Sequence, residues 1–75
     1  MDSARYDLGK RIYTGKATVA VTGAATGQEA RLRALQARLP AKEQRKVDIT
    51  ALSGKLSAEQ LDALEYYVAH RFPQK

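Results

Sequence analysis

The side chains that could carry chemistry are few, and most lie in the C-terminal third of the chain. His70 is the single histidine and there is no cysteine, so no familiar zinc or thiolate metal site can be assembled. Glu59, Asp62 and Glu65 recur at intervals of three, which places them along one side of a helix. Paired catalytic carboxylates need an apolar or crowded setting that separates their pKa values, and no such setting is indicated here. We therefore expect a histidine at a helix end, a solvated acidic face, and no enzyme activity.

A glycine-containing stretch, residues 22–28 (TGAATGQ), precedes a predicted helix. Backbone N–H groups at a helix N-terminus can bind phosphate. The stretch lacks the G-x-x-x-x-G-K-[ST] signature, and it does not clearly follow a strand as that motif requires. Residues 17–26 are small, uncharged and without a helical period, so we expect a loop there and no phosphate site.

The basic residues are concentrated in the middle of the chain. The formal net charge is +5 and the isoelectric point is near 9.8. Such a surface can favour anionic partners, although a solvated helix face is the simpler interpretation, because arginine and lysine are also good helix formers. The concentrated residues are Arg31, Arg33, Arg38, Lys42, Arg45 and Lys46.

The 75 residues are expected to form one small domain spanning 1–75. No apolar run approaches the ~18 residues of a membrane span, and no signal peptide is evident at the N-terminus. Ser3 can cap a first helix over residues 4–14. Thr26 and Glu29 fit a capping box, which predicts a second helix through about Leu39.

Helix signals continue through the second half of the chain. Residues 41–46 predict a short helix and residues 47–54 a connection. A second capping box, Ser57 with Gln60, opens a last helix that runs to about Arg71. The fold class is therefore predicted to be all-α. Its expected core residues are Leu32, Leu35 and Leu39 on one helix, Leu61, Leu64, Val68 and Phe72 on another, and the anchors Val47, Ile49 and Leu52.

Three stretches resemble small bacterial c-type cytochromes: residues 9–13 (GKRIY), residues 17–23 (ATVAVTG) and residues 52–68 (LSGKLSAEQLDALEYYV). The resemblance covers nearly the whole chain. It implies a cytochrome c-like fold of three to four helices in which the first and last helices cross closely. Glycine lets two backbones approach, and aromatic rings supply buried area. The implied crossing contact consists of Gly9, Tyr13, Leu64 and Tyr67.

The chain departs from these cytochromes at the residues that hold haem. The positions of the C-x-x-C-H motif read Ala17, Ala20 and Val21, and the axial methionine position falls near Ile49. Cytochromes hold their iron through histidine and methionine, so we expect no haem and no cofactor. An empty haem space would be costly. We expect it to be closed by collapse onto Leu32, Leu35, Ile49, Leu52 and the Val19–Val21 loop, the alternatives being another ligand or a partner chain.

Tyr66 and Tyr67 are adjacent and therefore point about 100° apart on a helix. The resemblance implies that Tyr67 packs inward, and Tyr66 should then lie at the surface. There it could form an apolar patch with Phe72 for a partner, although packing at the domain edge is the simpler interpretation. The candidate partner-binding residues are Arg31, Arg33, Arg38, Lys42 and Tyr66.

Three functions are compatible with these observations. The leading hypothesis is a non-catalytic, haem-less module for protein interaction or structure, with an acidic partner protein; the resemblance implies a periplasmic or exported location in bacteria. The alternative is a carrier of a small hydrophobic ligand or noncovalent haem in the vacated pocket. The third is a basic helical nucleic-acid binder, which is disfavoured because neither helix-turn-helix spacing nor an aromatic platform is evident.

Overall fold

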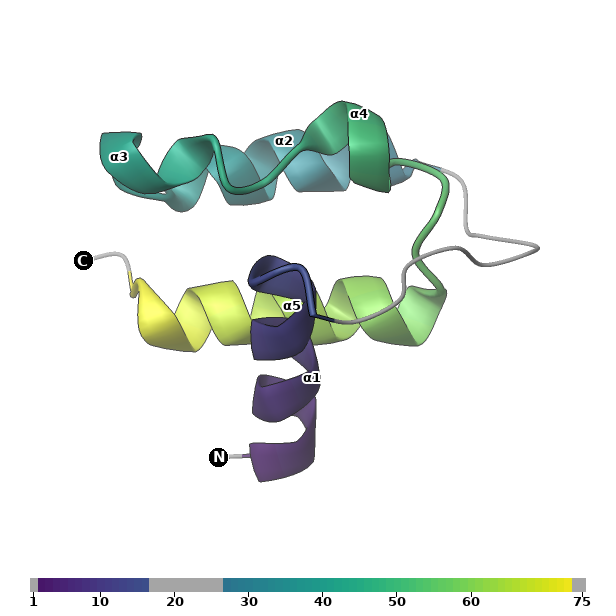
Figure 1. Ribbon diagram of the computed structural model, residues 1–75, viewed down its shortest axis with the longest axis vertical. Helices are drawn as coiled ribbons and strands as arrows, with labels where there is room; N and C mark the ends of the chain where they lie inside the picture. The colour runs from purple at the N-terminus through teal and green to yellow at the C-terminus, as the bar shows by residue number, and fades with distance from the viewer. Residues whose placement is uncertain (1, 17–26, 74–75) are drawn as a thin grey trace.

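The computed structural model describes residues 2–16 and 27–73 of the chain (Figure 1). The described part is helical and contains no strand, so the predicted all-α class is confirmed. None of its helices is long and apolar enough to cross a membrane. The elements are α1 (Ser3–Tyr13), α2 (Gln28–Arg38), α3 (Ala41–Gln44), α4 (Ile49–Leu52) and α5 (Ala58–Arg71).

The helix starts differ from the predicted ones at α1 and α2. Asp2, rather than Ser3, caps α1, because its Oδ1 accepts a hydrogen bond from the Arg5 N–H at 3.0 Å. The N-cap of α2 is Gly27, which has a φ of 78° and makes no side-chain cap. Thr26 lies outside the described residues. The observed N-cap is thus one residue later than the predicted one, and the predicted hydrogen bonds between Thr26 and Glu29 lie outside what the structure describes.

Side-chain capping hydrogen bonds explain where α4 and α5 begin. The capping box of α5 is confirmed: the Ser57 Oγ accepts from the Gln60 N–H at 3.0 Å, and the Gln60 Oε1 accepts from the Ser57 N–H at 2.9 Å. The expected connection over 47–54 instead contains α4. Asp48 caps that helix by accepting from the Ala51 N–H at 3.1 Å, a signal that the sequence reading overlooked.

The most extensive helix contact in the described chain is the crossing of α1 over α5 (Figure 1). Gly9 lies at this crossing. A Cβ atom built on Gly9 would lie 2.1 Å from the Ala63 carbonyl oxygen and 2.5 Å from the Tyr67 Cβ. Such separations are far below van der Waals contact, so only glycine allows the two backbones to lie this close.

Aromatic rings surround the crossing. The Tyr13 and Tyr67 rings lie 5.3 Å apart, the Tyr6 and Tyr67 rings 4.9 Å apart, and the Tyr13 and Phe72 rings 6.0 Å apart. These separations are in the favourable range for aromatic pairs. Leu64 is fully buried in the same core. Gly9 itself meets Ala63 and Tyr67, one residue before and three residues after Leu64.

The second helical layer, α2 to α4, lies over α5 (Figure 1). Leu32 and Leu35 from α2 are buried against it, and Val47 is buried as predicted. Ile49 and Leu52 are only half-buried and pack on the edge of the core, so these two are not the deeply buried anchors that we expected. Val19 and Val21 lie outside the described residues.

Replacing Gly9 with alanine should destabilise the domain, although alanine is the better helix former by about 0.8–1 kcal/mol. The added methyl group meets backbone atoms, and overpacking of this kind costs about 1–3 kcal/mol. Because the nearest atoms belong to the Ala63 backbone, we expect the cost at the upper end of this range. The net loss in the free energy of unfolding should then be about 1–2 kcal/mol, measured by urea denaturation with circular dichroism. The exposed neighbour Lys10→Ala should stay within about 0.5 kcal/mol. A Gly9→Ala variant as stable as wild type would show that the helices do not touch there.

Candidate functional site

A groove with a volume of about 340 Å³ lies at the surface between α2 and α5. We call it the α2–α5 groove. Its apolar lining residues are Ala34, Leu35, Val68 and Ala69. Its polar lining residues are Arg31, Arg38, Asp62, Glu65 and Tyr66. The groove therefore brings together Arg31, Arg38 and Tyr66, three of the candidate partner-binding residues, which are distant in sequence.

Arg31 is held by Glu65 across the groove. Its Nε donates to the Glu65 Oε2 at 3.1 Å, and its Nη2 donates to the Glu65 Oε1. This two-point pairing is the strong geometry for an arginine and a carboxylate. The charge of Arg31 is thus largely satisfied within the domain, and its role is to join α2 to α5.

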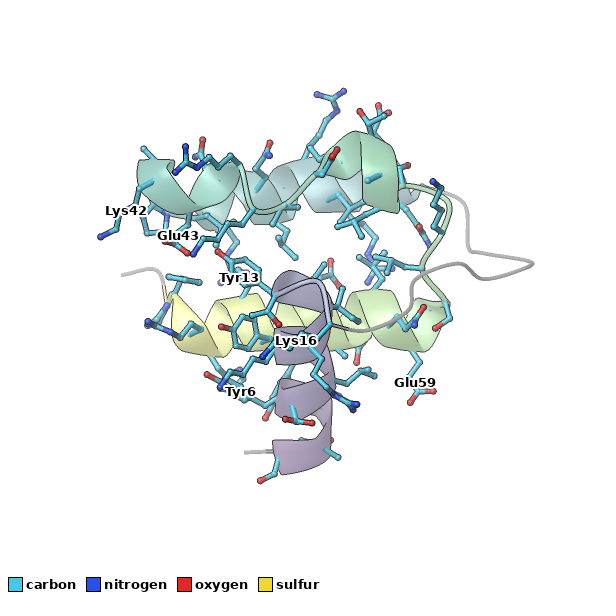
Figure 2. All side chains as sticks on the ribbon, in the orientation of Figure 1. Tyr6, Tyr13, Lys16, Lys42, Glu43 and Glu59 are labelled. Atoms are coloured by element: carbon cyan, nitrogen blue, oxygen red, sulfur yellow. The ribbon has the colours of Figure 1, made fainter. Side chains whose placement is uncertain are left out.

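The carboxylates of α5 do not form the uniform solvated face that the sequence suggested. Glu65 is half-buried and bound to Arg31. Asp62 lies 3.1 Å from the Arg5 Nε and links α5 to α1. Glu59 points away from the body of the molecule (Figure 2). Each acidic group therefore has a different environment, and the described residues contain no cluster that could hold a metal ion.

Arg38 lines the groove and differs from Arg31 because no carboxylate within the described ranges pairs with it. Arg38 is exposed to solvent. Arg33 lies on the opposite side of α2, where its Nε is 3.4 Å from the Glu29 Oε2. Lys42 lies on α3, at the end of the molecule where α5 ends (Figure 2). Neither Arg33 nor Lys42 lines the groove.

Tyr66 is half-buried and already has several contacts. Its hydroxyl oxygen accepts a hydrogen bond from the Asp2 N–H at 2.6 Å. Its ring stacks on that of His70 with 4.1 Å between centroids, and the Arg5 guanidinium lies 5.2 Å from the ring centroid. Phe72 packs against Tyr13 rather than beside Tyr66. The rings of Tyr66 and Phe72 therefore pack against different residues, His70 and Tyr13 respectively.

His70 is exposed at the end of α5. Its Nδ1 lies 2.9 Å from the carbonyl oxygen of Tyr66. A carbonyl oxygen only accepts, so the Nδ1 carries the proton in this hydrogen bond. His70 thus acts as a local contact of the last helical turns, in keeping with the expected histidine at a helix end.

Tyr13 is connected to α3 by a hydrogen bond that the sequence did not reveal. Its hydroxyl donates to the Glu43 Oε1 at 2.8 Å, and the Lys46 Nζ lies 3.0 Å from the same oxygen (Figure 2). Burial, and then the hydrogen bond to Glu43, raise the pKa of Tyr13 above 10.0. The hydrogen bond from Tyr13, and then that from Lys46, lower the pKa of Glu43 below 4.5.

A second hollow, of about 460 Å³, lies beside this connection. Its lining residues are Tyr13, Thr14, Gly15 and Lys46. Tyr13 is the one aromatic residue in this lining, and no aliphatic residue such as leucine or valine belongs to it. A site for a hydrophobic ligand is typically lined by apolar and aromatic side chains, so this hollow does not favour the carrier hypothesis.

The side-chain amide of Gln28 fixes the start of α2 to the chain that leads into α5. Gln28 is buried, its Oε1 accepts from the Gly54 N–H at 2.8 Å and from the Leu56 N–H at 3.4 Å, and its Nε2 donates to the Leu56 carbonyl. Sequence reasoning missed this residue, because a glutamine beside a basic helix is expected to be solvated.

Two further amides hold the chain that follows α2. The Gln36 Nε2 donates to the carbonyl oxygens of Gln44 and Val47 at 3.0 and 2.9 Å. The Gln44 Nε2 donates to the Leu39 carbonyl at 3.2 Å. These bonds hold the short helix α3 against α2 without needing many apolar contacts.

The residues present do not fit a haem. Ala17, Ala20 and Val21, the attachment positions in the resemblance, lie outside the described residues and have no ligating atom. Ile49, at the axial position, is the first residue of α4 and packs on the core with an apolar side chain. Iron requires a donor atom such as the histidine nitrogen or methionine sulfur of cytochromes, and Ile49 supplies none.

Comparison of the chain with models of protein families, with curated proteins and with solved structures finds no match.

Replacing Gln28 with leucine should destabilise the domain. The change removes the side-chain partner of the Gly54 N–H, which lies at an exposed residue, and of the buried backbone groups of Leu56. A buried group that stays unsatisfied costs about 1–3 kcal/mol. We expect a corresponding loss in the free energy of unfolding, and faster hydrogen exchange at the Gly54 and Leu56 amides. Ala30→Leu places the same side chain at an exposed position two residues later in α2 and should change the free energy of unfolding by less than about 0.5 kcal/mol. Equal effects of the two variants would contradict a special role for the amide.

The raised pKa of Tyr13 predicts a loss of stability in alkali. Because the folded pKa lies above the unfolded value of 10.0, the folded state holds the proton more tightly. This contribution is complete below pH 10.0 and is lost as the pH rises above that value. Tyr13→Phe should therefore lose stability less steeply between about pH 10 and pH 12 than wild type. Tyr6→Phe is the control, and identical slopes for wild type and Tyr13→Phe would contradict the prediction.

Proposed function

We propose that this chain is a non-catalytic protein-interaction module that binds an acidic segment of a partner protein. The observation that carries the proposal is how the basic residues of α2 and α3 are paired. Arg31, Arg33 and Lys46 are each paired with a carboxylate, of Glu65, Glu29 and Glu43 respectively.

Arg38, Lys42 and Arg45 have no ion pair with any described residue. We call these three the basic triad. All three are exposed and lie within residues 38–45, at the junction of α2 and α3. Uncompensated charges of one sign raise the local potential and attract an oppositely charged partner. The net charge of +5 adds to this attraction.

The arrangement of the aromatic rings supports a protein partner over a nucleic acid. Proteins that bind single strands stack bases on exposed aromatic faces. In the described chain the rings pack on one another around the crossing of α1 and α5, and Tyr66 is stacked on His70. The rings are thus used within the fold.

We also propose that the chain is a haem-less relative of small c-type cytochromes, with a periplasmic or exported location that rests on this relationship alone. The close α1–α5 crossing at Gly9 and the adjacent Tyr13–Tyr67 pair support the relationship. The apolar Ile49 at the axial position supports a module that works without haem.

Neutralising the basic triad should weaken binding to an acidic probe, for which we choose a fluorescently labelled polyglutamate peptide. The triple change Arg38→Gln, Lys42→Gln and Arg45→Gln should reduce affinity about tenfold at low salt, because it removes three positive charges that attract the carboxylates of the peptide.

The matched control changes Lys10, Lys16 and Lys55 to glutamine. It removes the same charge from other surfaces and should reduce affinity by less than about threefold. Equal losses in the two triple variants would mean that the probe responds only to net charge, and the proposed surface would then be wrong.

A further inference from the structure

We propose that the α2–α5 groove receives a single aliphatic side chain of the acidic partner segment, with an adjacent carboxylate of that segment binding Arg38. This inference rests on the proposed function and specifies its partner: a peptide in which a leucine-like residue is flanked by aspartate or glutamate.

The shape of the groove comes from small residues. Ala34 is exposed on α2 and Ala69 is half-buried on α5, and both line the groove together with the buried residues Leu35 and Val68. Alanines at these positions of the two helices leave room that longer side chains would fill. The volume of about 340 Å³ is near the lower end of the range for small-molecule pockets, about 300–1,000 Å³. This volume leaves room for one aliphatic side chain.

The charges around the groove are asymmetric. Glu65 is bound to Arg31, and Asp62 is paired with Arg5, which also pairs with Asp2. Arg38, one helical turn beyond Ala34 on α2, lines the groove without a carboxylate partner among the described residues. The groove thus combines an apolar lining with the positive charge of Arg38, which no carboxylate of the described residues compensates. This combination complements an aliphatic side chain with a neighbouring carboxylate.

A peptide fits this arrangement better than a free fatty acid. The apolar lining is formed mainly by two alanines and the edges of two core residues, which is too short a surface for a long acyl chain. The rest of the basic triad lies farther along the chain, on α3 and at its end. A charged peptide can extend its other carboxylates toward that region. Several such contacts together provide affinity that a single carboxylate would not.

The test compares two acetylated glutamate peptides of equal length and charge, one with a central leucine and one with a central serine. Wild-type protein should bind the leucine peptide about tenfold more tightly, because an aliphatic side chain is removed from water. Amide chemical shifts of Ala34, Leu35 and Ala69 should move on addition of the leucine peptide.

Variants that fill the groove separate the contribution of its apolar lining to peptide binding from that of the surface charges. Ala34→Leu and Ala69→Leu change residues that are not fully buried and should abolish the preference for leucine while retaining binding of the serine peptide. Ala37→Leu adds the same side chain at an exposed position of α2 that does not line the groove, and it should retain the preference. Circular dichroism of each variant checks that the helices are intact.

Each outcome has a distinct meaning. Equal binding of both peptides by wild type, sensitive to the basic triad, would overturn the groove inference while leaving the proposed function in place. Binding of neither peptide would overturn both. Binding of octanoate at the groove, with no preference between the peptides, would overturn the inference and identify a small amphipathic ligand instead. Loss of the leucine preference in Ala37→Leu would also overturn it.

Discussion

Because Gly9 has no side chain, the backbone of α1 can lie directly against that of α5, where a methyl group would meet the Ala63 carbonyl oxygen at 2.1 Å. This close approach determines where the surrounding rings can be. It brings Tyr13 to Tyr67, and it places the Tyr13 hydroxyl within hydrogen-bond distance of Glu43 on α3. The position of the second helical layer thus depends in part on a contact made between the first and last helices.

Polar side chains complete this framework where apolar contacts are few. The Gln28 amide holds the start of α2 to the chain before α5, and the Gln36 amide holds the chain after α3. Arg31 and Glu65 then join α2 to α5 directly. A small domain has little apolar area to bury, so satisfied amides and ion pairs help to specify one arrangement of its helices. This arrangement leaves at the surface the α2–α5 groove and Arg38, which has no ion pair among residues 2–16 and 27–73.

Local signals allowed much of the fold to be predicted from the sequence. The capping box of Ser57 and Gln60 gave the start of α5, because both partners lie within one turn of chain. The leucine periodicity of α2 gave its buried face. Asp2 and Asp48 carry equally local capping signals. They were not predicted because Ser3 is an alternative cap beside Asp2, and because α4, which Asp48 caps, has only four residues.

Long-range contacts were beyond the reach of sequence patterns. Nothing in the sequence around Tyr13 indicates that its hydroxyl meets Glu43, thirty residues later. For the same reason, Arg31, Arg33 and Arg38 looked equivalent as candidate partner-binding residues. Their different roles arise from which side of α2 they occupy and which carboxylates other helices supply. The groove itself exists only once α2 and α5 are packed together.

If the α1–α5 crossing holds the fold together, these contacts fold the chain without a cofactor. The most direct test is a proton–nitrogen correlation spectrum of the purified chain, recorded before and after addition of haem. We predict a well-dispersed spectrum, with the Gly9, Gly54 and Leu56 amides resolved and protected from exchange, and no change on adding haem. A poorly dispersed spectrum that sharpens when haem is added would contradict the account, because the core would then depend on a bound group rather than on the α1–α5 crossing.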